Sequence, residues 1–285
     1  FVNSAFAYYN TILFEKFNWK EKIMTSDCSI LENRCLKGLY RKIVFHAPEI
    51  AAKAQPGQFV HIHIPSLRDR ILRRPFSICG YDPEAETLTV VYKVVGSGTA
   101  ELAEMLPGQS CNVMGPLGKG YPMPGGDETP VLVAGGYGSA AILPLAKRSV
   151  NKGMLLLGAR SAADIILSEE YEAAGYDVRL ATQDGSLGHK GLVTELLDKA
   201  LTDAPKTPVL YACGPTPMLM ALGRLAVAKN VKCYLSLDQH MCCGIGACFA
   251  CVVKMKDPSS PDGWRYSRTC KEGPVYTAEE VYYEA

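Results

Sequence analysis

Short runs of β-branched and aromatic residues, with polar residues between them, dominate the chain up to residue 125. Pro and Gly separate these runs, and their length and spacing are typical of β-strands rather than helices. The clearest runs are LYRKIVFHAP, GQFVHIHIP and TLTVVYKVV, at residues 39–48, 57–65 and 87–95. Short strands at this spacing predict a small antiparallel barrel or sandwich over residues 24–125. The run at 114–126 is rich in Gly and Pro, and we expect it to be a linker.

The pattern changes after residue 126, where continuous apolar runs alternate with helix-like stretches. The apolar runs read as buried strands at 129–136, 153–160, 176–182 and 207–215. Strands that alternate with helices imply a parallel sheet with helices on both faces. The sequence therefore predicts a Rossmann-like α/β domain over residues 126–230. This layout is typical of nucleotide-binding domains, although a fold alone does not establish a function.

The two ends of the chain follow neither pattern. Residues 231–285 are rich in Gly and Cys and have no obvious core, so we expect a small C-terminal domain. Residues 1–23 lack the basic start, continuous apolar run and cleavage site of a secretory signal. Because Met24 resembles a normal start, we expect residues 1–23 to be an extension outside the fold. The alternative is an amphipathic helix that packs on a partner.

Composition and charge narrow the possible classes. The 285 residues suffice for two compact domains and a small third one. The formal net charge is +1 without a long basic run, so nucleic acid is not an expected partner. No apolar run is long enough to read as a transmembrane segment. Eleven cysteines without a recognisable signal indicate a reducing compartment, and we expect a cytoplasmic protein whose thiols serve metals or redox chemistry.

Four cysteines lie within HMCCGIGACFACVV, residues 240–253. Counted from Cys243, the spacing is C-x4-C-x2-C through Cys248 and Cys251, and Cys270 follows after 18 residues. Plant-type ferredoxins bind a 2Fe–2S cluster with this arrangement of four thiolates. A zinc site is the main alternative, but structural zinc loops usually pair their cysteines closely in both halves. Disulfides or inert thiols are the third possibility.

The residues around these cysteines suit a loop that wraps a cluster. Gly244 and Gly246 permit backbone angles that a Cβ would forbid. We expect Cys270 to return on a hairpin, with one strand at 251–256 and the other at 264–270. The C-x4-C spacing selects Cys243 as the first ligand and leaves Cys242 as a spare thiol.

Weaker motifs indicate nucleotide sites. GYGSAA at 136–141 follows a strand, opens a helix and matches G-x-G-x-x-G/A, a turn that can approach a pyrophosphate. A standard dinucleotide fold has an acidic residue about 20 positions later, and this sequence has none there. The motif could therefore also be an ordinary tight turn without a ligand. Cys213 ends a strand where ligands of open α/β sheets bind, but it could equally be a small buried thiol. In the β region, Arg74 and the GSGT turn at 96–99 could hold phosphates, or they could be ordinary barrel surface. The histidines suggest no metal site or catalytic triad.

Together these motifs resemble the electron-transfer subunits of type B dihydroorotate dehydrogenase, which belong to the ferredoxin-reductase superfamily. The resemblance runs from about residue 30 to the end and is most specific in CGIGACFAC and the closing CKEGPVY. It implies an antiparallel FAD-binding β-barrel, a parallel-sheet NAD domain and a small C-terminal 2Fe–2S domain. Phe76 replaces the Tyr of many reductases, and SAAILPL after the glycine turn differs from the usual sequence, which affects the expected NAD contacts.

The resemblance also implies roles for individual residues, with the catalytic ones unknown. FAD would contact Arg74, Pro75, Phe76, Ser77, Val91, Tyr92, Lys93, Gly98 and Thr99. NAD, as a substrate, would lie against Gly135, Gly136, Gly138, Cys213, Gly214 and Pro215. The cluster would be held by Cys243, Cys248, Cys251 and Cys270.

The implied activity is an electron relay in pyrimidine biosynthesis. Electrons would pass between NAD and the FMN of a dihydroorotate dehydrogenase catalytic subunit through FAD and the 2Fe–2S cluster. The family suggests a heterotetramer of two such chains with two catalytic subunits. The nearest alternative is a reductase subunit of a ferredoxin:NADP oxidoreductase or hydrogenase complex. A non-enzymatic electron carrier and a zinc-stabilised binding module are two further alternatives.

Overall fold

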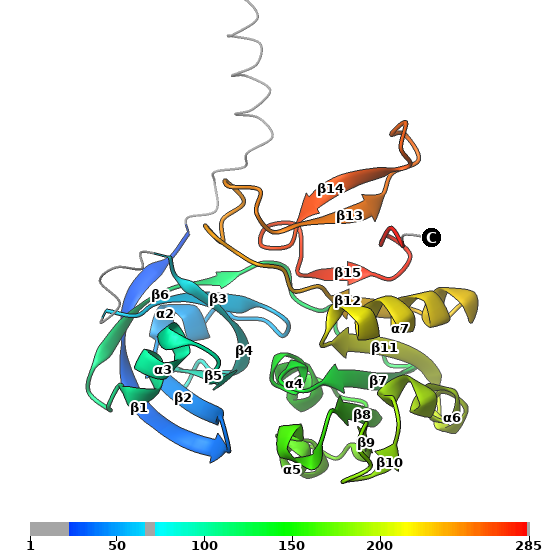
Figure 1. The fold of residues 1–285 in the computed structure, drawn as a ribbon, viewed down its shortest axis with the longest axis horizontal. Helices are drawn as coiled ribbons and strands as arrows, with labels where there is room; N and C mark the ends of the chain where they lie inside the picture. Colours follow the sequence, from blue (N-terminus) through cyan, green and yellow to red (C-terminus); the bar gives the residue numbers. More distant parts are fainter. Residues whose placement is uncertain (1–22, 66–71, 284–285) are drawn as a thin grey trace, which may run out of the picture.

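The computed structural model describes residues 23–65 and 72–283. They form a closed barrel, a helix-flanked seven-stranded sheet and a small two-stranded hairpin near the C-terminus. In Figure 1 the barrel runs from blue to blue-green, the sheet is mostly green to yellow with one red edge strand, and the hairpin is orange. The predicted fold class, β plus α/β with a small C-terminal domain, is confirmed. The predicted extension at 1–23 lies, apart from its last residue, outside the described residues.

The barrel is antiparallel, with the strand order β1-β2-β5-β4-β3-β6. Its elements are β1 (Thr25–Lys37), β2 (Tyr40–His46), α2 (Pro48–Ala51), β3 (Phe59–His63), β4 (Arg74–Asp82), β5 (Thr87–Lys93), α3 (Ser97–Glu104) and β6 (Ser110–Leu117). Because alternate residues of a strand face opposite sides, Val60 and Ile62 of β3 enter the barrel core. The linker predicted at 114–126 is wrong for its first four residues, because β6 runs through Gly115 and Pro116 and closes the barrel against β1 and β3.

The second part is a sheet of order β10-β9-β8-β7-β11-β12-β15. Its strands are β7 (Glu128–Gly135), β8 (Met154–Ala159), β9 (Asp177–Thr182), β10 (His189–Lys190), β11 (Thr207–Cys213), β12 (Cys233–Ser236) and β15 (Val275–Thr277). Its helices are α4 (Gly138–Arg148), η1 (Ala162–Asp164), α5 (Ser168–Ala173), η2 (Val193–Leu196), α6 (Leu197–Asp203) and α7 (Thr216–Ala228). All pairings are parallel except that of β15 with β12.

Helices cover both faces of this sheet, as the sequence predicts. Leu132 and Ala134 of β7 pack in one apolar cluster with α4 and α5. Val131 and Val133 point the other way, into a second cluster that contains α6 and α7. No helix among the described residues is long and apolar enough to cross a membrane.

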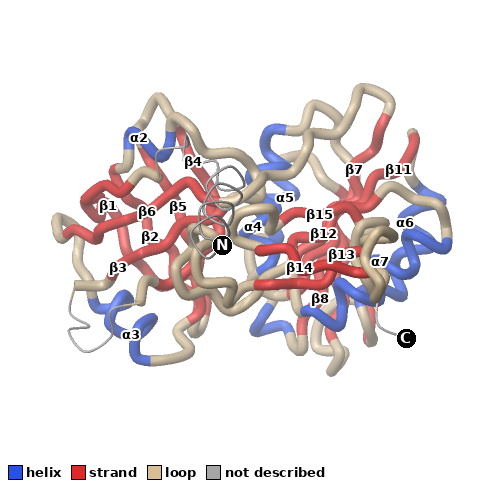
Figure 2. Tube along the Cα trace, turned by 90° about the horizontal axis from the view of Figure 1, so that it is seen from above, coloured by secondary structure: helices blue, strands red, loops and turns tan. Residues whose placement is uncertain are grey.

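The sheet extends beyond residue 230, the end of the predicted NAD domain. β12 pairs with β11, and β15 adds an antiparallel edge strand to β12. Strands of four and three residues are too short to produce a clear periodic pattern, which is why the sequence did not reveal them. Between them in the chain comes the hairpin of β13 (Val252–Lys256) and β14 (Trp264–Arg268), which lies beyond the β15 edge of the sheet in Figure 1 and nearest the viewer in Figure 2.

Candidate functional site

A cavity of about 320 Å³ lies between the barrel and the sheet. It gathers eight of the nine residues predicted to contact FAD, namely Arg74, Pro75, Phe76, Ser77, Val91, Tyr92, Lys93 and Thr99. The ninth, Gly98, is buried in the first turn of α3 and is not part of the lining. The sheet contributes Cys213 and Gly214 to the same cavity. We call this space the barrel cavity.

The chemistry of the barrel cavity suits a flavin with a diphosphate tail. The rings of Phe76 and Tyr92 lie 5.7 Å apart and provide apolar surface for an aromatic ligand. The N-terminus of α3 presents backbone N–H groups that favour an anion. Thr99 orders this turn, because its hydroxyl accepts hydrogen bonds from the N–H groups of Val95 and Gly96 at 2.9 and 3.1 Å.

A second cavity, of about 620 Å³, lies beside the first at the carboxyl ends of the sheet strands. Its lining includes Gly135, Gly136 and Pro215, three of the residues predicted to contact NAD. The backbone φ of Gly136 is positive, and a Cβ there would meet no neighbouring atom, so a ligand could approach the main chain closely. Open α/β sheets bind nucleotides at this position. We call this space the sheet cavity.

The other predicted NAD residues lie elsewhere. Cys213 and Gly214 line the barrel cavity, and Gly138 lines neither cavity because it packs against the carbonyl group of Cys213. Burial raises the pKa of the Cys213 thiol to about 12, so it is uncharged at neutral pH.

Lys93 and Tyr137 line both cavities, which therefore adjoin. Sequence reasoning missed Tyr137, although its place within the glycine turn could have indicated it.

A polar contact joins the barrel to the sheet domain beside the two cavities. The Lys93 ammonium lies 2.6 Å from Oδ1 of Asp164 in η1, and the Tyr40 hydroxyl donates to the same oxygen at 2.9 Å. Lys37 adds hydrogen bonds to the carbonyl groups of Ala162 and Ile165, at 2.7 and 3.0 Å. Lys93 thus holds the two domains together as well as lining both cavities.

The carboxyl group of Asp164 makes this contact dependent on pH. The hydrogen bond from Lys93, supported by that from Tyr40, outweighs burial and lowers the pKa of Asp164 below its ordinary value. Its stabilising effect is therefore complete above about pH 4, the ordinary aspartate value, and is lost as pH falls through the lower pKa of the folded protein.

We expect Asp164→Asn to lower the free energy of unfolding by about 1–2 kcal/mol at neutral pH, because Lys93 loses its charged partner. The difference from the parent should shrink as pH falls below about 4, since the parent carboxyl then also becomes neutral. Denaturant unfolding at several pH values measures it. Asp177→Asn is the control, because that ion pair with Arg179 is 56% exposed on the aspartate side. An Asp164→Asn effect that stayed constant with pH would contradict the role of the charge.

The four predicted cluster cysteines meet in two pairs at one end of the barrel. Cys248 donates its backbone N–H to Sγ of Cys243 at 3.4 Å, and the thiols of Cys251 and Cys270 are in hydrogen-bond contact. Hydrogen bonds from the backbone at Ala250 and Cys243 lower the pKa of Cys248 and favour the thiolate that binds metal. Cys242 also contacts Cys248.

This arrangement fits a cluster of two irons. Within residues 23–65 and 72–283, no three His, Cys, Asp or Glu side chains are grouped so that they could hold a metal ion as they stand. A 2Fe–2S cluster divides its four thiolates between two irons, and the two thiol pairs match that demand. Gly244 and Gly246 both have positive φ, which lets the loop turn between the first two ligands. The donor set therefore suits the predicted cluster.

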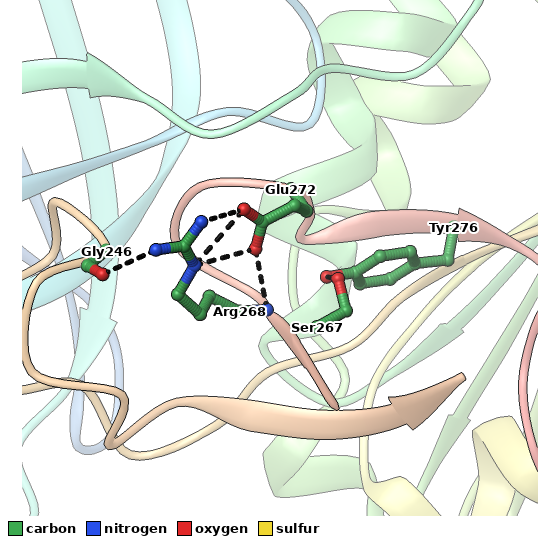
Figure 3. Close-up of polar contacts among 5 residues, drawn as sticks. All are labelled: Gly246, Ser267, Arg268, Glu272 and Tyr276. Atoms are coloured by element: carbon green, nitrogen blue, oxygen red, sulfur yellow. Dashed lines mark hydrogen bonds and ion pairs between the residues drawn. The ribbon is translucent and has the colours of Figure 1, made fainter. Parts of the chain in front are cut away.

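Arg268 braces the cluster loop, as Figure 3 shows. Its guanidinium donates to the Gly246 carbonyl group at 2.8 Å and forms an ion pair with Glu272. It also lies 4.9 Å from the centre of the Phe249 ring. Burial alone would raise the pKa of Glu272, but the hydrogen bonds from Arg268 lower it. One side chain thus holds both parts of the loop that carry the first three predicted ligands.

The cluster segment packs on the outside of the barrel. Cys251 and Cys270 are buried in one cluster with Phe59, Met114 and Leu117, which come from β3 and β6. Phe59 also lines the barrel cavity, so it contacts both regions. Phe59 therefore connects the barrel cavity to Cys251 and Cys270, two of the predicted cluster ligands.

Comparisons with known proteins agree with this geometry. The family model of the iron–sulfur cluster binding domain of dihydroorotate dehydrogenase B matches residues 238–282. The dihydroorotate dehydrogenase B (NAD(+)) electron transfer subunit of Geobacillus sp. (strain WCH70) is 42% identical over 231 residues, which cover 79% of this chain and 86% of that protein. The same subunit from Shouchella clausii (strain KSM-K16) is 38% identical over 246 residues, covering 84% and 91%.

Solved structures show the same architecture. A chain of the NADH-dependent reduced ferredoxin–NADP oxidoreductase has a TM-score of 0.78 and 30% identity over 90% of both chains. The ferredoxin reductase of carbazole 1,9a-dioxygenase, with a TM-score of 0.63 and 22% identity over 73% of this chain and 67% of its own, shows the fold alone. From its sequence identity to these subunits over most of their length, the chain belongs to the family of dihydroorotate dehydrogenase B electron transfer subunits.

Proposed function

We propose that this chain relays electrons between NAD and the catalytic subunit of an NAD-dependent dihydroorotate dehydrogenase. The observation that carries the proposal is the order of the three sites. Lys93 and Tyr137 belong to both cavities, and Phe59 joins the barrel cavity to Cys251 and Cys270. The sites for NAD, FAD and the cluster are thus consecutive, as a relay requires.

When bound, FAD would supply hydride chemistry toward NAD and one-electron chemistry toward the 2Fe–2S cluster. The chain itself orders these ligands. The turn at Gly136 leaves main chain open to the dinucleotide, and the N-terminus of α3 favours the FAD diphosphate. The residues of β4 and β5 that line the barrel cavity would surround the flavin ring, and Lys93 fixes the sheet domain against the barrel.

We assign the FAD contacts to the eight barrel-cavity residues and to Gly98 at the start of α3. For NAD we assign Gly135, Gly136 and Pro215 in the sheet cavity, with Gly138 as support beneath the turn. Cys213 and Gly214 would lie where the nicotinamide meets the flavin, since they line the barrel cavity at the end of β11. The cluster ligands proposed are Cys243, Cys248, Cys251 and Cys270.

The partner proposed is an FMN-containing catalytic subunit that holds the orotate site, in a heterotetramer with two copies of each chain. Phe249, beside the exposed Cys248, has 55% of its surface accessible at the tip of the cluster loop. A partner that docks there would come close to the cluster. We place the complex in the cytoplasm, where a reducing environment suits a chain with eleven cysteines.

We expect anaerobically purified protein to show flavin bands together with broad iron–sulfur absorbance, and NADH should bleach both. An ultraviolet–visible titration with NADH, followed by dithionite as a control, measures this. Bleaching by dithionite but not by NADH would support the electron-carrier alternative, and a colourless protein would exclude the relay. Coexpression with an FMN subunit, followed by an orotate assay, then distinguishes the proposed relay from the ferredoxin:NADP oxidoreductase alternative. The chain is 30% identical to a chain of one such oxidoreductase.

A further inference from the structure

His61 is a completely buried histidine between the barrel and the cluster loop. Its neighbours Val60 and Ile62 point into the barrel core, so His61 lies on the outer side of β3, as does Phe59. The outer side of a barrel strand normally meets water, but His61 has 0% of its surface exposed. The cluster segment covers it.

The imidazole ring lies directly against the cluster loop. A Cβ built on Gly244 would be 2.7 Å from Cε1 of His61 and 2.9 Å from both ring nitrogens. Gly244 follows the proposed ligand Cys243 in the chain. On the same side of β3, the Phe59 ring, 5.7 Å from the His61 ring, packs with the ligands Cys251 and Cys270. His61 is therefore surrounded by the segments that would hold the cluster.

Neither ring nitrogen of His61 has a hydrogen-bond partner among the described residues. A buried polar group without a partner costs free energy, and such a group in a native protein calls for a partner. Either neutral tautomer of the imidazole ring, like its protonated form, offers at least one N–H donor.

We propose that His61 donates a ring N–H hydrogen bond to a sulfur of the 2Fe–2S cluster. This inference rests on the proposed function, because it requires the cluster. Hydrogen bonds to the sulfurs of such clusters help to set their reduction potential. A donor stabilises the reduced form, which carries one more negative charge. His61 is thus a tuning residue that reaches the cluster from the flavin-binding barrel, and no metal ligation is assigned to it.

The first test uses the unaltered full chain, labelled with ¹⁵N only in histidine and reduced to its paramagnetic state. We expect pulsed electron paramagnetic resonance to detect a weak ¹⁵N coupling that is absent from unlabelled protein. A cluster signal without histidine coupling would overturn the proposal. Absence of iron and of any cluster signal would instead contradict the proposed function, so the two failures are distinguishable.

The second test compares His61→Phe with His61→Gln, which keeps a donor, and with His63→Phe. His63 is the matched control because it lies two residues along β3 on the same side and is partly exposed. We expect His61→Phe to keep about two irons per chain, lose the ¹⁵N coupling and reduce at a more negative potential. His61→Gln should lie nearer the parent, and His63→Phe should match it. An iron-replete His61→Phe cluster with the parent potential would refute the tuning role, and if His61→Phe binds no iron the labelling test alone decides.

Discussion

Replacing Cys243 with serine is expected to remove most of the iron from this protein, from about two irons per chain to below about one. Cys243 lies at the start of the C-x4-C spacing, and its sulfur accepts a hydrogen bond from the backbone of Cys248. A negative charge on Cys243 would raise the pKa of Cys270, in the other thiol pair. Cys242, one residue earlier, contacts Cys248, so the structure places two thiols near the same ligand.

Cys242→Ala is the matched control, because it tests whether Cys243 rather than Cys242 is the first ligand. It should retain the iron content and the absorbance of the parent, because the spare thiol is not needed by the cluster. Iron analysis and the visible spectrum of anaerobically purified variants measure the outcome. If Cys242→Ala lost the iron and Cys243→Ser kept it, the first ligand would be Cys242 and the loop register would shift by one residue.

Replacing Gly138 with alanine is expected to destabilise the sheet domain by about 3 kcal/mol and to abolish reduction by NADH. A Cβ at this position would lie 2.2 Å from the carbonyl oxygen of Cys213 and 2.6 Å from its carbonyl carbon. These are backbone atoms, so relief requires that α4 moves away from β11. That movement would disrupt the glycine turn and the strand end between which we place the nicotinamide.

Comparison with Gly136→Ala separates steric crowding by the added Cβ from the strain of a positive backbone φ. A Cβ there meets no neighbour, but the backbone φ is positive, in the left-handed region. The cost of alanine in that conformation should be only about 1–2 kcal/mol. Urea unfolding and the rate of flavin reduction by NADH measure both variants. Equal stability of Gly138→Ala and Gly136→Ala would show that the close packing beneath the turn is not important.

The sequence predicts features that depend on local spacing. The cluster cysteines follow from C-x4-C-x2-C and a hairpin return, and the structure places their thiols in two pairs. The strand-helix alternation after residue 126 predicts the parallel sheet with covered faces. In the barrel, clear alternation predicted β2, β3 and β5, but β1 and β6 carry polar residues or breakers and were not distinguished.

Other features depend on segments that are distant in sequence. Asp164 meets Lys93 across 71 positions, and no local pattern indicates that pairing. His61 and His63 look equivalent as alternate residues of one strand, and only the cluster segment folded over β3 makes one of them completely buried. The continuation of the sheet past residue 230 also depends on a distant pairing, because β15 joins β12, a strand almost 40 residues earlier.

The position of β15 determines how the segment with the four cysteines could be removed or transplanted. The segment with the four cysteines begins after β12 and ends before β15, so both of its ends are anchored in the same sheet. It is an insertion rather than an appended module. Cutting the chain after β12 would expose a sheet edge that invites aggregation. A transplant into another reductase would have to carry β12, β15 and their register, and a cassette that begins at the first cysteine would lack its anchor.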